Sequence, residues 1–259
     1  MRGALGDFVR LELKEKQDLS ERSTFMNKEK ITILRWYDIV ILTLILIGHG
    51  ILNSTLQFLD MLKNPVIPYS GNNVEFSVLQ NYQALANQLI WLFLAILYLL
   101  WRNFDFSIWA KKIKLTPWVP LQTIGIFLLT ALVMDLFHLL TYQFAIPTIP
   151  SLFGIFSNLD LSLVLYSLLN GFYEEIYFLG ICLAVKPEYQ KWTFLFSLLV
   201  RFSFHTYQGL GAAFGIGILM GSLFYFLYQK MGQKNLLPFF LAHAIADMIG
   251  LSILFYFWQ

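Results

Sequence analysis

The sequence predicts an all-α membrane protein, a polytopic helical bundle of about seven transmembrane helices. Of its 259 residues, 58% are hydrophobic and only 13% are charged, whereas a soluble domain has about 25% charged residues. The apolar residues form seven runs, each near or above the length of about 18 residues at which a segment becomes a candidate for a transmembrane helix. Because the backbone must satisfy its own hydrogen bonds in lipid, and the runs are too long for barrel strands, we expect each run to be helical.

A polar segment over residues 1–35 precedes the first apolar run. Its charges alternate in sign, which argues against a cleavable signal peptide, and Met26 is an alternative start to Met1. The seven runs follow at residues 37–59, 82–101, 119–143, 161–185, 192–210, 212–229 and 236–258. An eighth, partial span over residues 146–158 is an alternative, although its prolines favour a surface or re-entrant segment.

Lys and Arg are distributed unevenly over the two predicted sides of the membrane. With the N-terminus in the cytoplasm, the segments on that side hold sixteen basic residues and the opposite side holds only Lys63. Positive charge accumulates on the cytoplasmic side of membrane proteins. We therefore expect a cytoplasmic tail over residues 1–35, N-terminal transmembrane helices over 36–150 and a core domain over 151–259. The net charge of +2 is small and dispersed, so the predicted partner is the lipid bilayer and not nucleic acid.

Six ionisable side chains lie within predicted spans of the C-terminal half, where a charged group is costly and marks a functional site by default. They are Glu174 and Glu175 in the fourth span, Arg201 and His205 in the fifth, and His243 and Asp247 in the seventh. The pairs in the fifth and seventh spans are each four residues apart, so the two residues of each pair share a helix face. At about 1.5 Å per residue, four of these groups on three helices lie at similar depths, and we expect them to meet; they are Glu174, His205, His243 and Asp247.

Carboxylates and imidazoles in a cavity with little water can activate a water molecule. The carboxylate acts as a general base, and an imidazole orients the water or donates to the developing oxyanion. No Ser, Cys or Thr nucleophile is evident beside the histidines, and the single cysteine, Cys182, lies within an apolar run, so covalent catalysis is disfavoured. The sequence requires no cofactor. Zinc is an alternative, although no HExxH motif is present; its ligands would be Glu174, His205, His243 and Asp247.

Three short motifs occur in order along the polar spans. They read EEIYFLG over residues 174–180, RFSFHTYQG over 201–209 and AHAIAD over 242–247. Together they resemble the pattern EExxxR, FxxxH and HxxxN or HxxxD of the CPBP family, the CAAX prenyl protease, bacteriocin-processing and Abi group of intramembrane peptidases. The resemblance covers roughly residues 160–258.

The resemblance implies a function and a role for each site residue. Glu174, with Glu175 beside it, would activate the attacking water together with His205, while His243 and Asp247 would line the oxyanion side. The chain would then be an endopeptidase of the bacterial plasma membrane that cleaves a peptide or a membrane-associated protein. Other roles implied by the family are bacteriocin maturation or immunity and the regulation of a partner sensor histidine kinase.

The chain departs from the family pattern at two positions. The Arg of EExxxR is replaced by Leu179, and the Phe of FxxxH is replaced by Arg201. Because an unpaired guanidinium in the membrane is costly, we predict that Arg201 crosses to Glu175 and restores the ion pair between two helices. A separation of more than about 6 Å from both glutamates would contradict this pairing. The alternative is that the altered motif records lost catalysis, and that the chain is a non-catalytic partner of a kinase or a bacteriocin immunity protein.

Overall fold

The computed structural model describes residues 29–64, 77–141 and 159–254. These residues form helices and no strand apart from one isolated bridge between Ile31 and Phe104, so the predicted all-α class is confirmed. Segments η1 and η3 are π-helical and η2 is a 3₁₀ turn. In chain order the elements are α2 (Trp36–Leu46), α3 (Gly48–Lys63), α4 (Val78–Trp101), α5 (Ser107–Ala110), α6 (Val119–Thr141), α8 (Leu161–Glu175), η1 (Ile176–Ile181), α9 (Pro187–Phe204), η2 (Thr206–Gln208), α10 (Leu210–Phe214), η3 (Gly215–Met220), α11 (Gly221–Lys230) and α12 (Leu237–Ile249).

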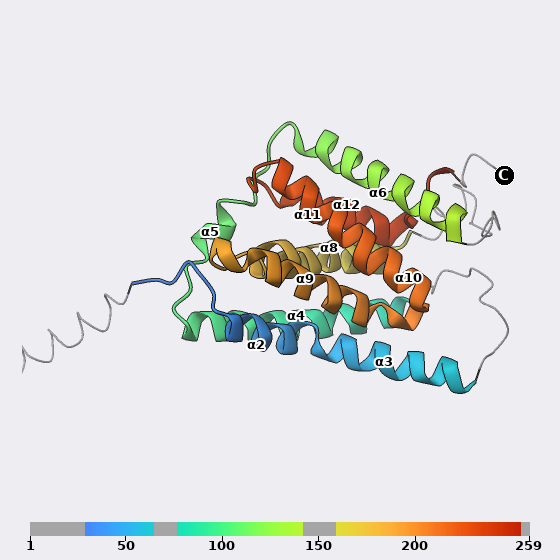
Figure 1. The fold of residues 1–259 in the computed structure, drawn as a ribbon, viewed down its shortest axis with the longest axis horizontal. Coiled ribbons are helices and arrows are strands. Elements are labelled where there is room, and N and C mark those ends of the chain that lie inside the picture. The colour runs from blue at the N-terminus through green and yellow to red at the C-terminus, as the bar shows by residue number, and fades with distance from the viewer. Residues whose placement is uncertain (1–28, 65–76, 142–158, 255–259) are drawn as a thin grey trace, which may run out of the picture.

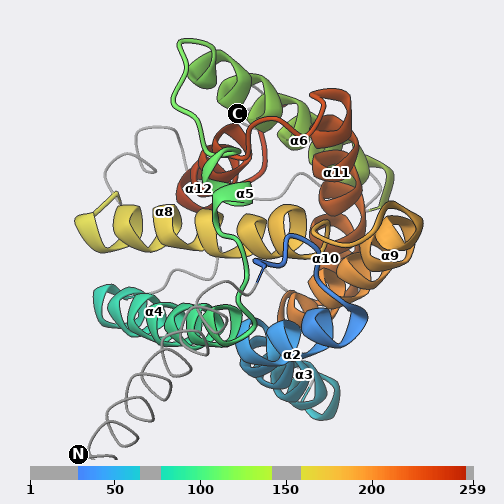
Figure 2. The same ribbon diagram turned by 90° about the vertical axis from the view of Figure 1, so that its left-hand side faces the viewer.

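The long helices lie side by side in a bundle, with α8 near its middle (Figure 1), and the end-on view shows that α8 crosses the bundle obliquely (Figure 2). Seen end-on, α2, α3 and α4 lie on one side of α8, and α6 and α12 lie on the other (Figure 2). Helix α8 packs against both α4 and α12. Polar side chains near the end of α8 are therefore enclosed by neighbouring helices.

The count of seven or eight transmembrane helices is only partly supported. Among the described residues, three helical stretches are long and apolar enough to cross a membrane, namely α4, α6 and Leu210–Lys230, and the bent pair α2 and α3 would make a fourth. Helices α8, α9 and α12 occupy the other predicted spans, but α8 has 15 residues and α12 has 13, and α9 carries charged side chains. The segments 1–28 and 146–158 lie outside the described residues.

The first predicted span is broken. Helices α2 and α3 meet at Ile47 and bend by 59°. A break at membrane depth releases backbone groups that need new partners, and here the Leu46 carbonyl accepts a hydrogen bond from the hydroxyl of Tyr173 on α8. Because Tyr173 directly precedes Glu174, the break in the first span is attached to the helix that carries the polar site.

The crossing of α8 and α12 depends on a glycine. A Cβ atom at Gly171 would lie 2.3 Å from the Phe240 carbonyl oxygen and 2.9 Å from the Ala244 backbone nitrogen. A small residue at such a contact lets two membrane helices approach at backbone distance. This close approach brings His243, between Phe240 and Ala244 in the sequence, to the end of α8.

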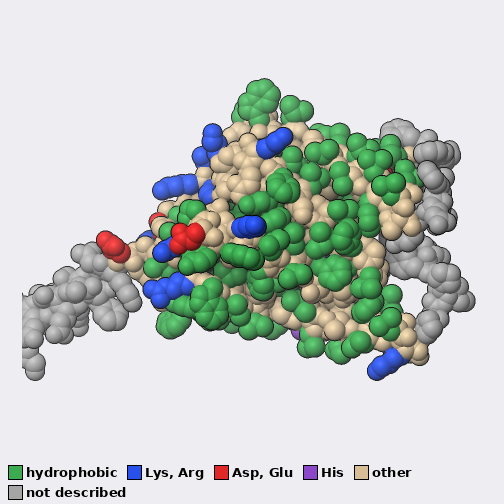
Figure 3. Space-filling model, viewed as in Figure 1, with side chains coloured by type: hydrophobic (Ala, Val, Ile, Leu, Met, Phe, Trp, Pro, Cys, Tyr) green, Lys and Arg blue, Asp and Glu red, His purple; other side chains and the backbone are tan. Residues whose placement is uncertain are grey.

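The surface agrees with a membrane setting. Hydrophobic side chains cover most of the visible face, and most of the visible Lys and Arg gather toward one end of the bundle (Figure 3). That end contains α5 and the beginnings of α6, α9 and α12 (Figure 1).

Candidate active site

The six ionisable residues singled out in the sequence converge where α8, α9 and α12 meet. Glu174 and Glu175 are the last residues of α8 and stand immediately before the π-helical segment η1. Such π-helical segments occur frequently at functional sites, since they redirect side chains relative to a regular helix. Glu175 is 0% exposed, four of the others are buried as well, and the Asp247 side chain is partly exposed, at 23%.

Glu175 holds the centre of this cluster. The Arg201 guanidinium donates from Nη2 to Glu175 Oε1 at 2.6 Å, and His243 Nδ1 lies 2.7 Å from the same oxygen. The guanidinium also lies 3.9 Å from the centre of the Phe178 ring, a cation–π contact. The predicted ion pair between two helices is thus confirmed, at a distance well inside the limit that would have contradicted it.

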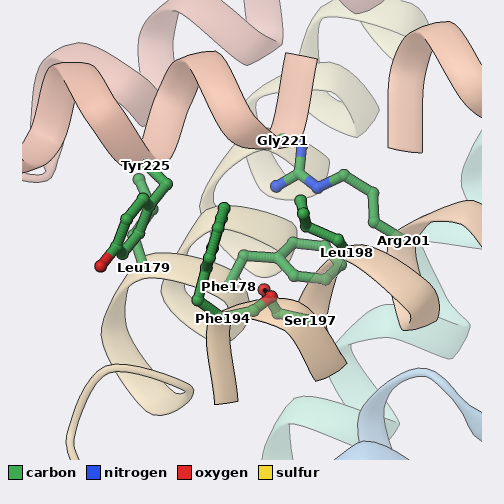
Figure 4. A pocket seen from close by; sticks show the side chains of 8 residues that line it. All are labelled: Phe178, Leu179, Phe194, Ser197, Leu198, Arg201, Gly221 and Tyr225. Atoms are coloured by element: carbon green, nitrogen blue, oxygen red, sulfur yellow. Dashed lines mark hydrogen bonds between the residues drawn. The ribbon is translucent and has the colours of Figure 1, made fainter. Parts of the chain in front are cut away.

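A small cavity of about 10 Å³, close to the volume that one water requires, adjoins Arg201. Figure 4 shows that Arg201 enters it from one side and Leu179, the position of the family arginine, lines it from another. Arg201 Nη1 makes no hydrogen bond to any described residue. Leu179 and Arg201 line the same cavity, so a guanidinium extended from either position would enter it.

His243 connects the three carboxylates. Its Nε2 atom lies 3.7 Å from Glu174 Oε2 and 3.6 Å from Asp247 Oδ1, while Nδ1 contacts Glu175. Glu174 Oε2 is buried and has no hydrogen-bond partner among the described residues. The imidazole therefore lies between Glu174, which can accept a proton, and Asp247, one turn further along α12.

Two amide side chains that sequence reasoning missed complete the cluster. Asn170 Nδ2 donates to Glu174 Oε1 at 3.2 Å and to Asp247 Oδ2 at 2.8 Å. Gln88 of α4 donates to Asn170 Oδ1 at 2.5 Å, which fixes the direction of the amide. The available signal was the spacing, because Asn170 lies four residues before Glu174 and so shares its helix face.

His205 joins the cluster less directly. Its Nδ1 atom lies 2.8 Å from the Arg201 backbone carbonyl. With the Nδ1 proton donated to that carbonyl, Nε2 of the neutral ring is an acceptor, an assignment made from the hydrogen-bond geometry. Its described hydrogen bond therefore goes to the helix backbone, whereas the other five predicted residues contact one another.

The predicted ligands do not fit a shared metal ion. Within residues 29–64, 77–141 and 159–254, no group of three or more His, Cys, Asp and Glu side chains is placed to hold one. The nearby Arg201 guanidinium would also repel a metal cation. No step of the chemistry below is therefore assigned to zinc.

Comparison with known proteins supports the resemblance drawn from the motifs. Residues 156–249 match the family model described as type II CAAX prenyl endopeptidase Rce1-like, and this range contains all six ionisable site residues. No curated protein and no solved structure matches the chain. The apolar helices and this match together indicate an integral membrane protein. Residues 156–249 are therefore similar to the Rce1-like domain, and this similarity is consistent with the CPBP family of intramembrane peptidases.

Proposed function

We propose that the protein is an intramembrane endopeptidase in which Glu174 activates water to cleave a peptide or a membrane-associated protein. The observation that carries the proposal is the free Oε2 atom of Glu174, which is buried without a hydrogen-bond partner among the described residues, while Asn170 holds Oε1. A carboxylate fixed through one oxygen presents the other to a reacting molecule. This is the arrangement that a general base needs.

The attacking water donates one hydrogen to Glu174 Oε2 and the other to His205 Nε2, so both acceptors orient its lone pair toward the scissile carbonyl. Glu174 takes the proton as the water oxygen bonds to the carbonyl carbon, and the carbonyl π electrons move to oxygen. His243, protonated at both nitrogens, keeps its contact with Glu175 and donates from Nε2 to the oxyanion. The tetrahedral intermediate then collapses, the C–N bond breaks, and the proton on Glu174 passes to the leaving amine.

Arg201 and Glu175 position the imidazole in this scheme and do not touch the substrate. Both side chains are buried, and Glu175 Oε1 receives Arg201 and His243 together. The guanidinium balances one of the three carboxylates, which lowers the cost of gathering them out of water. The family match favours a CAAX-type peptide as the substrate class.

The alternative function, a non-catalytic regulator of a sensor kinase or a bacteriocin immunity protein, rested on the missing motif arginine. Arg201 provides a guanidinium at Glu175 from the neighbouring helix. The missing motif arginine therefore does not imply that the site is lost. No other feature of the described residues favours a non-catalytic function.

A cleavage assay with purified protein in proteoliposomes tests the proposal. The substrates are peptides with a C-terminal CAAX sequence, each with and without a prenyl group on the cysteine, and mass spectrometry identifies the products. We expect cleavage by the wild type and a loss of at least about 100-fold in Glu174→Gln, the lower range for removing a general base. Glu188→Gln, on the exposed start of α9, is the matched control and should keep the wild-type rate. Equal rates in Glu174→Gln and wild type would refute the mechanism.

A further inference from the structure

An apolar groove lies on the outer surface of the bundle between α6, α8 and α12. Its volume is about 330 Å³, which falls at the lower end of the range for ligand sites, about 300–1,000 Å³. Of the described residues that line it, Thr123 alone has a polar side chain. The apolar lining includes Leu115, Val119, Ile124, Leu168, Ile245 and Met248.

A basic segment adjoins one end of this groove. Lys111, Lys112 and Lys114 directly precede Leu115 in the sequence. Three hydrogen bonds tie the segment to the start of α12. The Leu236 backbone nitrogen donates to the Lys112 carbonyl at 2.6 Å, and the Asn235 side chain bonds both the backbone nitrogen and the carbonyl of Lys114, at 3.1 and 2.8 Å. The lysines are therefore held where α6 and α12 begin.

The three lysines differ in their surroundings. The Lys112 ammonium lies 5.9 Å from the centre of the Tyr228 ring and is partly buried. Lys111 and Lys114 are exposed, and neither forms an ion pair with a described acidic side chain. Two cations are thus available beside the apolar groove. Trp118, 66% exposed in the same connection, is typical of a residue at the membrane interface.

We propose that this groove binds one acyl chain of an anionic phospholipid of the surrounding bilayer, with the lipid phosphate held by Lys111 and Lys114. The groove supplies the apolar surface for the chain, and the lysines at its end supply the complementary charge for the headgroup. Each lysine is expected to favour an anionic over a neutral headgroup by about 5-fold, which corresponds to about 1 kcal/mol per basic residue near the surface. Two lysines give a preference of about 30-fold.

The groove is separate from the candidate active site. On α12 it is lined by Leu241, Ile245 and Met248, while His243 and Asp247 point to the carboxylate cluster. At about 100° per residue these two sets lie on different faces of the helix. A bound lipid would brace α12 against α6 and α8 without occupying the place of the substrate. The proposal therefore stands independently of the proposed function.

Lipid binding is measured by native mass spectrometry of the full chain in detergent, titrated with phosphatidylglycerol or with phosphatidylcholine of the same acyl chains. We expect one phosphatidylglycerol to bind about 30-fold more tightly than phosphatidylcholine. The double variant Lys111→Gln/Lys114→Gln should lose this preference. Lys191→Gln, which removes an exposed lysine at the same end of the bundle on α9, should keep it.

A second pair of variants tests the groove itself. Ile124→Trp places a large side chain in the groove and should abolish the tightly bound lipid, whereas Leu129→Trp places it on an exposed part of α6 that does not line the groove and should not. Circular dichroism confirms that each variant is folded. Equal binding of the two lipids, retention of the lipid in Ile124→Trp, or selective retention of a neutral lipid would each overturn the proposal.

Discussion

Replacing Arg201 with leucine removes the partner of a carboxylate that is entirely buried. The Arg201 and Glu175 side chains are 2% and 0% exposed and lie 2.6 Å apart. Removing one member of a buried ion pair costs about 3–5 kcal/mol, because the remaining charge is left without compensation. His243 also contacts Glu175 and offsets part of this loss, so we expect the lower end, about 3 kcal/mol.

The family arrangement provides the matched rescue for this variant. In Leu179→Arg/Arg201→Leu a guanidinium extends into the same cavity from η1, and removing the Arg201 side chain provides the space it needs. We expect the double variant to recover most of the lost stability. Leu179→Arg alone should be destabilised, since a cavity of about 10 Å³ cannot take a second guanidinium and the added charge has no partner.

Unfolding in mixed detergent micelles of increasing SDS fraction, followed by circular dichroism, gives the free energy of unfolding for each of the four proteins. We expect a favourable coupling between the two substitutions. A loss below about 1 kcal/mol in Arg201→Leu, the range of an exposed ion pair, would refute it. The pairing would also be refuted if Leu179→Arg/Arg201→Leu were no more stable than the less stable of its two single variants.

Three further predictions follow from the packing and the polar network. Gly171→Ala should cost about 1–3 kcal/mol of stability through overpacking against the Phe240 carbonyl, whereas Gly125→Ala, whose Cβ would meet no atom within 4 Å, should be neutral or stabilising in the same unfolding assay. Asn170→Leu should lower the cleavage rate by about 10- to 100-fold, because the two carboxylates lose a hydrogen bond worth about 1.5–3 kcal/mol; an unchanged rate would remove Asn170 from the positioning scheme. Treatment with a metal chelator should leave the cleavage rate of wild-type protein unchanged, since the acidic and histidine side chains do not fit a shared ion, and a rate restored only by added zinc would contradict this.

Much of the site could be predicted because placing an ionised side chain in the hydrocarbon region has a high free-energy cost. Glu174, Glu175 and His243 are conspicuous within apolar runs, and the high cost of an unpaired guanidinium led directly from Arg201 to Glu175. The same reasoning explains why Asn170 and Gln88 were missed. Uncharged amides are tolerated in helices for many reasons, and only the distances show that they join Glu174 to α4.

The ends and breaks of the helices could not be predicted from the sequence. Apolar runs predict where helices form but not where they end, and α8 becomes π-helical directly after Glu175. At the break beside Ile47, the Leu46 carbonyl accepts a hydrogen bond from Tyr173, more than a hundred residues later in the chain. Contacts between residues so far apart in the sequence cannot be predicted from apolar runs. The predicted span count is supported only in part, because the helices that carry the site are short or charged.

The central claim, that Glu174 activates water for peptide cleavage, is tested most directly by mapping peptide termini in membranes of cells that lack the native gene. Cells expressing wild-type protein are compared with cells expressing Glu174→Gln at equal levels, so no substrate need be chosen beforehand. We predict a set of new termini that appears with the wild type and is absent with Glu174→Gln, while Glu188→Gln reproduces the wild-type set. Identical termini with wild type and Glu174→Gln would contradict the account.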